Sequence, residues 1–186
     1  MSTIEIRWHG RGGQGVVTAN EILAGAALKE GRYIKAFPEF GPERMGAPIR
    51  AFARISDEPI NIHSQVYYPD VVLVIDPTLL KVGNVVEGLK EDGTVIANFP
   101  EDNVKLGEVV DRKEKVHAVN ATRIAMEEIG RPLTNTAMLG ALVKVTGVVG
   151  IESIIEEMES KMSSKLSEEM MAKNLRAIRR AYEEVQ

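Results

Sequence analysis

The sequence predicts an α/β fold in which a mostly parallel sheet is flanked by helices, a Rossmann-like arrangement with a helical C-terminal third. Strand-like and helix-like segments alternate through the first two thirds, as they do when parallel strands are joined by helical crossovers. Residues 71–75 are continuously apolar and β-branched, which is typical of a central strand covered on both faces. The last third repeats apolar residues at helical spacing.

The first half of the chain supplies three of the expected strands. Residues 4–8 form the first strand, and a glycine-rich turn separates it from a helix over 16–28. A second strand is expected at 33–37 and a third at 49–55, where apolar residues alternate with polar or small ones. Between them, 38–48 holds three prolines and two glycines among its eleven residues, which predicts an ordered loop.

The middle of the chain continues the alternation. Asp76-Pro77 ends the strand at 71–75, and Asp92-Gly93 marks a later turn. The other elements expected here are a helical stretch around 85–89, a strand at 94–97, a last strand at 115–119 and a helix at 121–129.

Three helices are expected in the last third. Residues 135–145 are nearly all apolar, with Lys144 as the one charge, so this helix should be buried, and Gly147 is a plausible stop. A second helix repeats apolar residues from Ile151 to Met162. A third carries the seam Met171, Leu175, Ile178, Tyr182 and Val185. The seam docks either onto its own domain or onto a partner subunit.

Composition limits the class of protein. With 186 residues and 44% hydrophobic content, the chain can bury a core, and one domain over 1–186 is expected. A net charge of −4 argues against a nucleic-acid binder. No apolar run reaches the length of about 18 residues needed to cross a bilayer, and the N-terminus does not resemble a secretory signal. A soluble cytoplasmic protein that contacts no membrane is therefore expected.

The sequence contains no cysteine, which excludes thiol catalysis and cysteine-ligated iron–sulfur clusters in this chain. Its three histidines, His9, His63 and His117, lack metal-ligand spacing. No residues resemble a Ser-His-Asp set or a nucleophile beside a base. We expect no catalytic residue and no metal site here, and any electron carriers must lie on other chains.

The glycine turn holds the candidate ligand-binding residues. A strand, a glycine turn and a helix in this order aim backbone N–H groups and the positive end of a helix dipole at one place, which suits a phosphate or carboxylate. The alternative is a tight turn that packs helix on strand and binds nothing. The candidates are Gly10, Arg11, Gly12, Gly13, Gln14 and Gly15.

Gly10, Gly12 and Gly15 match the G-x-G-x-x-G pattern of dinucleotide sites. A standard nicotinamide site also places an acidic residue at the end of the second strand, about 20 positions further on. Here the second strand ends without one, since Glu39 follows a proline in the loop. This is evidence against a standard NAD site.

Parallel strands present their carboxyl ends at one edge, so Arg11 and Gln14 are expected near Asp76 and Asn98. Arg11 suits a phosphate because its guanidinium keeps its charge and offers several donors. The alternative for Asp76, which precedes a proline, and for Asn98 is the start of a turn, and the alternative for His9 is local hydrogen bonding. Glu43 and Arg44 are expected to pair with each other or with another chain.

Residues 9–16 and 40–48 form two motifs that, together with their spacing, resemble the gamma subunit of pyruvate and related 2-oxoacid:ferredoxin oxidoreductases. Similarity extends to the strand at 69–73 and the helix at 135–141, so it covers nearly the whole chain. The second motif is most similar to the pyruvate type, although branched-chain ketoacid, 2-oxoglutarate and indolepyruvate enzymes have related subunits. The motifs are His9-Gly10-Arg11-Gly12-Gly13-Gln14-Gly15-Val16 and Phe40-Gly41-Pro42-Glu43-Arg44-Met45-Gly46-Ala47-Pro48.

The resemblance implies a subunit of a larger enzyme that oxidatively decarboxylates a 2-oxoacid with coenzyme A, giving acyl-CoA, CO2 and reduced ferredoxin. In that family thiamine diphosphate and iron–sulfur clusters lie on partner subunits, and ferredoxin is met through the complex. Coenzyme A is a candidate shared ligand of this chain. The turn at 10–15 then either faces the coenzyme's phosphates or braces the surface between subunits.

Two other hypotheses remain open at this point. The first is a free-standing oxidoreductase that binds NAD(P) or FAD, which predicts tight nucleotide binding by the isolated chain. The second is a scaffold with no ligand at all.

Overall fold

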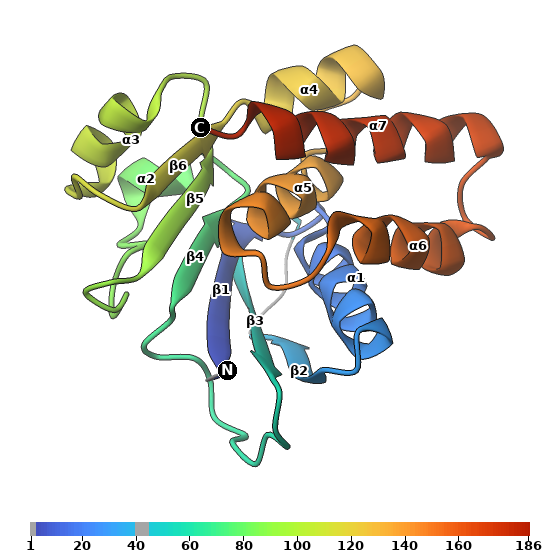
Figure 1. Ribbon diagram of the computed structural model, residues 1–186. Helices are drawn as coiled ribbons and strands as arrows, with labels where there is room; N and C mark the ends of the chain where they lie inside the picture. Colours follow the sequence, from blue (N-terminus) through green and yellow to red (C-terminus); the bar gives the residue numbers. More distant parts are fainter. Residues whose placement is uncertain (1–2, 40–44) are drawn as a thin grey trace.

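A computed structural model describes residues 3–39 and 45–186 of the chain. Within these residues the strands form one six-stranded sheet in the order β2-β3-β1-β4-β5-β6 (Figure 1). β3 pairs antiparallel with β1 and β2, whereas β1, β4, β5 and β6 run parallel to one another. The strands are β1 (Ile4–Arg11), β2 (Tyr33–Pro38), β3 (Pro48–Ser56), β4 (Val71–Val74), β5 (Thr94–Asn98) and β6 (Val116–Val119).

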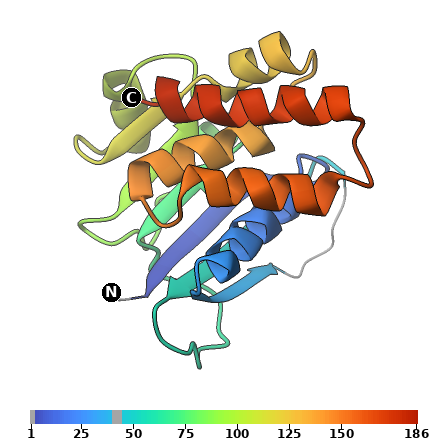
Figure 2. The ribbon, with the colours of Figure 1, turned by 45° about the vertical axis from the view of Figure 1, so that its right-hand side comes forward.

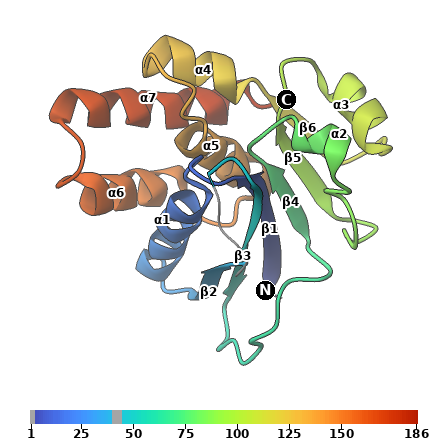
Figure 3. The same ribbon diagram turned by 180° about the vertical axis from the view of Figure 1, so that it is seen from behind.

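Helices cover the two faces of the sheet unequally. One side carries α1, α4, α5, α6 and α7, with α1 against the strands and α6 and α7 running across the outside (Figure 2). On the other side α2 and α3 lie beside β5 and β6 (Figure 3). The helices are α1 (Val16–Lys29), α2 (Leu79–Val82), α3 (Asn103–Val110), α4 (Ala121–Glu128), α5 (Asn135–Thr146), α6 (Ile151–Met162) and α7 (Glu168–Glu184).

The predicted fold class is confirmed, and most predicted elements agree with the structure to within one to three residues. The helix expected around 85–89 is wrong. The helix in this part of the chain is α2. The Asp76 carboxylate accepts a hydrogen bond from the backbone N–H of Thr78 just before it, and the side chains of Leu79 and Leu80 in the helix are buried. Residues 85–88 form turns, and Gly88 has a positive φ of 69°, which ends any helix at that point.

Two features of the fold were not predicted. Helix α3 begins where the Asp102 side chain accepts a hydrogen bond from the backbone of Lys105 at 2.9 Å, an ordinary N-cap. The loop expected at 38–48 is shorter, since β2 includes Pro38 and β3 begins at Pro48. The loop residues Glu43 and Arg44 lie outside the described residues.

Two separate apolar clusters form the core. The larger joins α1, α4, α5, α6 and α7 to one face of the sheet and includes Ile6, Trp8 and Ala53 from the strands. The smaller joins α2 and α3 to the opposite face and includes Val72 and Val74 from β4. β4 therefore contributes to both clusters, as its continuously apolar sequence predicted.

Helix α5 is buried along most of its length, as predicted, and ends at Gly147, whose φ is 59°. It packs against α7 so closely that a Cβ added at Gly140 would overlap the backbone carbonyl of Ile178. The seam of α7 faces this contact, with Ile178 fully buried. Of the two docking alternatives, the structure shows the seam on its own domain.

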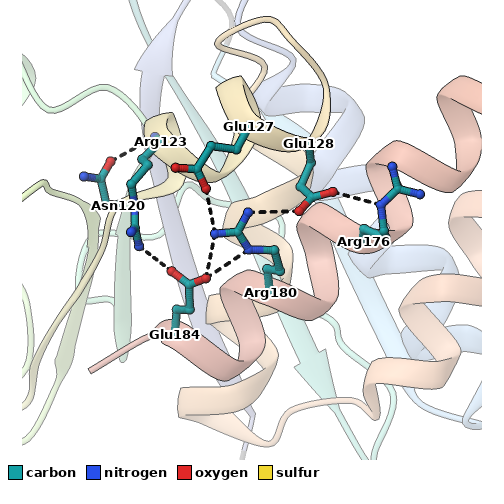
Figure 4. Close-up of polar contacts among 7 residues, drawn as sticks. All are labelled: Asn120, Arg123, Glu127, Glu128, Arg176, Arg180 and Glu184. Atoms are coloured by element: carbon teal, nitrogen blue, oxygen red, sulfur yellow. Dashed lines mark hydrogen bonds and ion pairs between the residues drawn. The ribbon is translucent and has the colours of Figure 1, made fainter.

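A group of ion pairs joins the outer surface of α7 to α4 (Figure 4). Arg180 pairs with Glu127, Glu128 and Glu184 at 2.9 Å each. Hydrogen bonds to Glu128, Glu127 and Glu184 raise the pKa of Arg180, so it stays charged. Isolated surface pairs stabilise little, but shared carboxylates fix one orientation of α7 on α4. The network is completed by Asn120, Arg123 and Arg176.

The last residues of the chain lie along β6. The backbone N–H of Gln186 donates to the carbonyl of Ala118 at 3.1 Å. Nδ1 of His117 lies 2.7 Å from the carbonyl oxygen of Gln186. Strand β6 thus has backbone hydrogen bonds on both sides, with β5 on one side and with Gln186 on the other.

Replacing Gly140 with alanine should destabilise the isolated chain. The added methyl group would be forced against the α7 backbone, and overpacking costs about 1–3 kcal/mol, more than the ~1 kcal/mol gained in helix propensity. Urea unfolding followed by circular dichroism measures the effect. Gly83→Ala is the control, because its Cβ would meet nothing closer than 3.6 Å. Equal stability of the two variants would contradict this packing.

Candidate functional site

The glycine turn lies at the carboxyl edge of the sheet, between β1 and α1. β1 lies between β3 on one side and β4 on the other, and the first crossover starts here. This is the position at which open α/β sheets bind ligands. Gly13 has φ of 91° and Gly15 has φ of 73°, conformations that side chains other than glycine rarely adopt.

The side chains of the turn are bound to Asp76, which follows β4. The amide of Gln14 donates to Oδ2 of Asp76 at 2.6 Å, and Oε1 of Gln14 accepts from the backbone of Arg11 at 2.7 Å. The Arg11 guanidinium lies 3.2 Å from the same carboxylate and donates to Thr78 Oγ1 at 2.9 Å and to the Gly46 carbonyl at 3.0 Å. The predicted proximity of Arg11, Gln14 and Asp76 is confirmed.

The Asp76 carboxylate is ionised in this setting. Partial burial alone would raise its pKa, but hydrogen bonds from Thr78 and Gln14 and the Arg11 charge outweigh that effect and lower the pKa. Its charge compensates the charge of Arg11. The side chains of the turn therefore hold one another in place, and its backbone is the part that is open to a ligand.

A hollow of about 470 Å³ lies where α1 begins. The N-cap Gly15 has no side chain, and the first turn of α1 contains no acidic residue. The N-terminal end of α1, with its positive dipole, therefore borders the hollow without a nearby carboxylate from that turn. The lining residues are Gly12, Gly13, Gly15, Val16, Val17, Thr18, Met45 and Ile49.

Asn98 lies at the same edge but serves the framework. It is buried, donates to the Ile75 carbonyl at 3.0 Å and to Thr122 Oγ1 at 2.9 Å, and so joins the ends of β4 and β5 to α4. His63 lies near Lys35, and His117 lies beside the C-terminal residue. None of these three side chains contributes to the hollow at α1.

His9 is buried on the face of β1 that points away from α1. Its Nε2 accepts a hydrogen bond from Nε of Arg7 at 3.1 Å. Burial first, and then the charges of Arg7 and Arg50, lower the pKa of His9 to about 3. His9 is therefore neutral near pH 7 and does not exchange protons there.

Sequence reasoning missed two buried arginines. Arg7 donates to the carbonyls of Val85 and Glu87, and Arg54 donates to those of Ser64 and Gln65. For Arg7 the sequence does contain a pattern that could have indicated this role, since charged or polar residues recur at every second position of β1. Two residues that line the hollow, Thr18 and Met45, were also not among the candidates.

Two searches of residues 3–39 and 45–186 gave negative results. No helix there is both long and apolar enough to cross a membrane. No three His, Cys, Asp or Glu side chains lie together in a way that would hold a metal ion.

The chain was compared with families and proteins already known. A sequence model of the pyruvate ferredoxin/flavodoxin oxidoreductase family matches residues 5–184. The chain belongs to this family. One member, the "pyruvate/ketoisovalerate oxidoreductases common subunit gamma" of Pyrococcus abyssi, is 52% identical over 184 residues, which cover 98% of this chain and 97% of that protein.

Two solved structures share the fold. Pyruvate oxidoreductase subunit PORC from Thermotoga maritima has 47% identity and a TM-score of 0.88, covering 100% of this chain and 98% of that one. A 2-oxoglutarate:ferredoxin oxidoreductase from Magnetococcus marinus, with 2-oxoglutarate, coenzyme A and succinyl-CoA bound, has a TM-score of 0.77. At 22% identity over 97% of this chain and 30% of that chain, this likeness concerns the fold.

The buried histidine should make the stability of this family member depend on pH. The pKa of His9 is lowered from 6.5 to about 3 on folding, so below pH 6.5 the unfolded chain takes up a proton that the folded chain does not. The free energy of unfolding should therefore fall as the pH decreases, by about 2 kcal/mol at pH 5 from this group alone.

Urea unfolding at pH 7.5 and pH 5 measures this loss. His9→Gln keeps an acceptor for Arg7 but cannot titrate, so its stability should fall by about 2 kcal/mol less than that of the unaltered chain over the same interval. An identical pH dependence in both proteins would show that His9 is not buried in this way.

Proposed function

We propose that this chain is the gamma-type subunit of a pyruvate or related 2-oxoacid:ferredoxin oxidoreductase. The observation that carries this proposal is the match along almost the full length of both chains to proteins named as gamma and PorC subunits. We further propose that residues 1–186 act as one domain in the cytoplasm. The substrate is proposed as pyruvate, because PorC relatives are named as subunits of pyruvate synthase.

The complete enzyme would convert the 2-oxoacid, coenzyme A and oxidised ferredoxin to acyl-CoA, CO2 and reduced ferredoxin. Thiamine diphosphate on a partner subunit would stabilise the carbanion left by decarboxylation, and iron–sulfur clusters on partners would pass the electrons to ferredoxin. This chain has no cysteine to ligate such clusters. Its part is to shape the complex and to contribute to the site of coenzyme A.

For coenzyme A we propose the hollow at the start of α1, where Gly12, Gly13 and Gly15 form part of the wall and Gly10, Arg11 and Gln14 complete the turn beside it. Coenzyme A carries phosphate groups, and the backbone N–H groups of a helix N-terminus suit a phosphate. Arg11 and Gln14 hold the turn open through Asp76. The complex from Magnetococcus marinus, which contains this fold, has coenzyme A bound.

Sheet order argues against the nicotinamide alternative. In a dinucleotide fold, the second strand lies parallel beside the first and presents an acidic residue to the ribose. Here antiparallel β3 lies between β1 and β2, and Glu39 after β2 is bound by Arg50 at 2.6 Å. Within residues 3–39 and 45–186, Glu39 is therefore not free to bind a ribose beside the glycine turn.

Thr18 provides the test of the coenzyme A proposal. It lines the hollow from the first turn of α1. An aspartate there would stabilise the helix N-terminus by about 0.3–1 kcal/mol while repelling a phosphate. In the assembled enzyme, Thr18→Asp should raise the KM for coenzyme A by roughly tenfold, which corresponds to ~1.4 kcal/mol, and leave the KM for pyruvate unchanged.

Thr18→Asn is the matched control, because it has the same shape as aspartate without the charge. It should leave the KM for coenzyme A within about a factor of three, or ~0.7 kcal/mol. An unchanged KM in Thr18→Asp would instead favour a scaffold without a ligand. Calorimetry of the isolated chain with NAD, FAD and coenzyme A tests the remaining alternative, and tight binding of NAD or FAD would refute the subunit proposal.

A further inference from the structure

Two buried polar atoms between α1 and the sheet have no hydrogen-bond partner within the residues that the structure describes. They are Nε1 of Trp8 on β1 and Oδ1 of Asn20 on α1. Trp8 is 0% exposed and Asn20 is 2% exposed, so bulk solvent does not reach either side chain. A buried polar group without a partner is costly, and folded proteins almost always provide one.

The two side chains lie at the same level of the contact between α1 and the sheet. Trp8 is opposite Ala51 in the pairing of β1 with β3. Nδ2 of Asn20 donates to the backbone carbonyl of Phe52, the next residue of β3, at 2.9 Å. α1 packs against both strands, and Trp8 belongs to the larger apolar cluster on the α1 side. The indole and the amide therefore share one layer of the core.

The orientation of the Asn20 amide is fixed by its bond to Phe52. If the amide were turned over, Oδ1 would face the Phe52 carbonyl, and two acceptors would oppose each other. Oδ1 is therefore an acceptor that needs a donor, whereas Nε1 of Trp8 is a donor that needs an acceptor. The two atoms are complementary but are not bonded to each other. A molecule that joins them must accept from the indole and donate to the amide.

Water meets this requirement, because one molecule accepts and donates at once. The side chains in this layer are short: Ala19 precedes Asn20 on α1, and Ala51 and Ala53 lie on β3, all three fully buried. Such short side chains suit an occupant as small as one water molecule. Neither Trp8 nor Asn20 lines the hollow at the start of α1, so this site is separate from the one proposed for coenzyme A.

We propose that one buried water molecule binds between Nε1 of Trp8 and Oδ1 of Asn20 and joins β1 to α1. Together with the bond to Phe52, the Asn20 side chain then links α1 to both β1 and β3. Asn20 lies about one turn beyond Val16, so these bonds fix where the first turn of α1 stands on the sheet. The inference does not depend on the proposed function, because it concerns contacts within this chain.

The indole of Trp8 provides a direct test, since it is the one tryptophan of the chain and gives a single indole N–H signal in an NMR spectrum. The probe is water itself, observed with the ¹⁵N-labelled full chain. We expect a rotating-frame NOE between water and the indole N–H, while the indole hydrogen exchanges slowly with solvent because it is buried. Slow exchange without any NOE to water would overturn the site.

Asn20→Leu removes the acceptor with little change in volume. It should abolish the NOE between water and the indole, and it should raise the unfolding equilibrium constant in urea by roughly tenfold or more, because Trp8 and the Phe52 carbonyl both lose a partner. Asn174→Leu is the matched control, since Asn174 is also a buried helical asparagine but bonds to Thr136 and Met170. It should destabilise the chain and leave the NOE at Trp8 unchanged.

An NOE that persists in Asn20→Leu, or that is lost in both variants, would overturn the site. If Asn20→Leu does not fold, a high-resolution crystal structure of the unaltered chain decides the question. A water oxygen within about 3.2 Å of both Nε1 of Trp8 and Oδ1 of Asn20 would support the site. A direct hydrogen bond between the two side chains, or a separate protein partner for each, would overturn it.

Discussion

The carboxylate of Asp76 holds together three segments that are far apart in the sequence. It accepts from Gln14 in the glycine turn and from Thr78 at the start of α2, and it neutralises Arg11, which also reaches the Gly46 carbonyl before β3. Because one charged group satisfies all these donors, the turn cannot move without leaving a partly buried charge unpaired. The position of the glycine turn therefore depends on this arrangement.

Strand β1 divides the chemistry of the molecule between its two faces. Toward α1 it contributes Ile6 and Trp8 to the larger core. Toward the opposite side it presents Arg7 and His9, which are buried by loops and bound to each other. Period-two alternation thus lets one strand serve an apolar core and a polar surface at once.

Much of the fold could be predicted because its elements have strong local signals. The strand at 71–75 is continuously apolar, and the buried helix ending at Gly147 is apolar on all sides. The helix at 85–89 was wrong because long-range contacts decide that segment, where the carbonyls of Val85 and Glu87 accept from Arg7. Such a contact spans about 80 positions and leaves no local pattern.

The candidate site was predictable in position but not in detail. Parallel strands bring their carboxyl ends to one edge, so Arg11, Gln14 and Asp76 were expected together. The local sequence around Arg11 does not show that this side chain is already paired, because its partner Asp76 lies 65 positions away. The order of the strands, with β3 between β1 and β2, likewise depends on the antiparallel hairpin and not on the glycine motif.

The contact of Gln186 with Ala118 has a consequence for the behaviour of the protein in solution. An outermost strand with free backbone groups is a template on which strands of other molecules can add, and this leads to aggregation. In this chain the tail occupies part of that template on β6. Gln186 therefore covers the backbone carbonyl of Ala118 on this side of β6, and the cover lasts only while that hydrogen bond is kept.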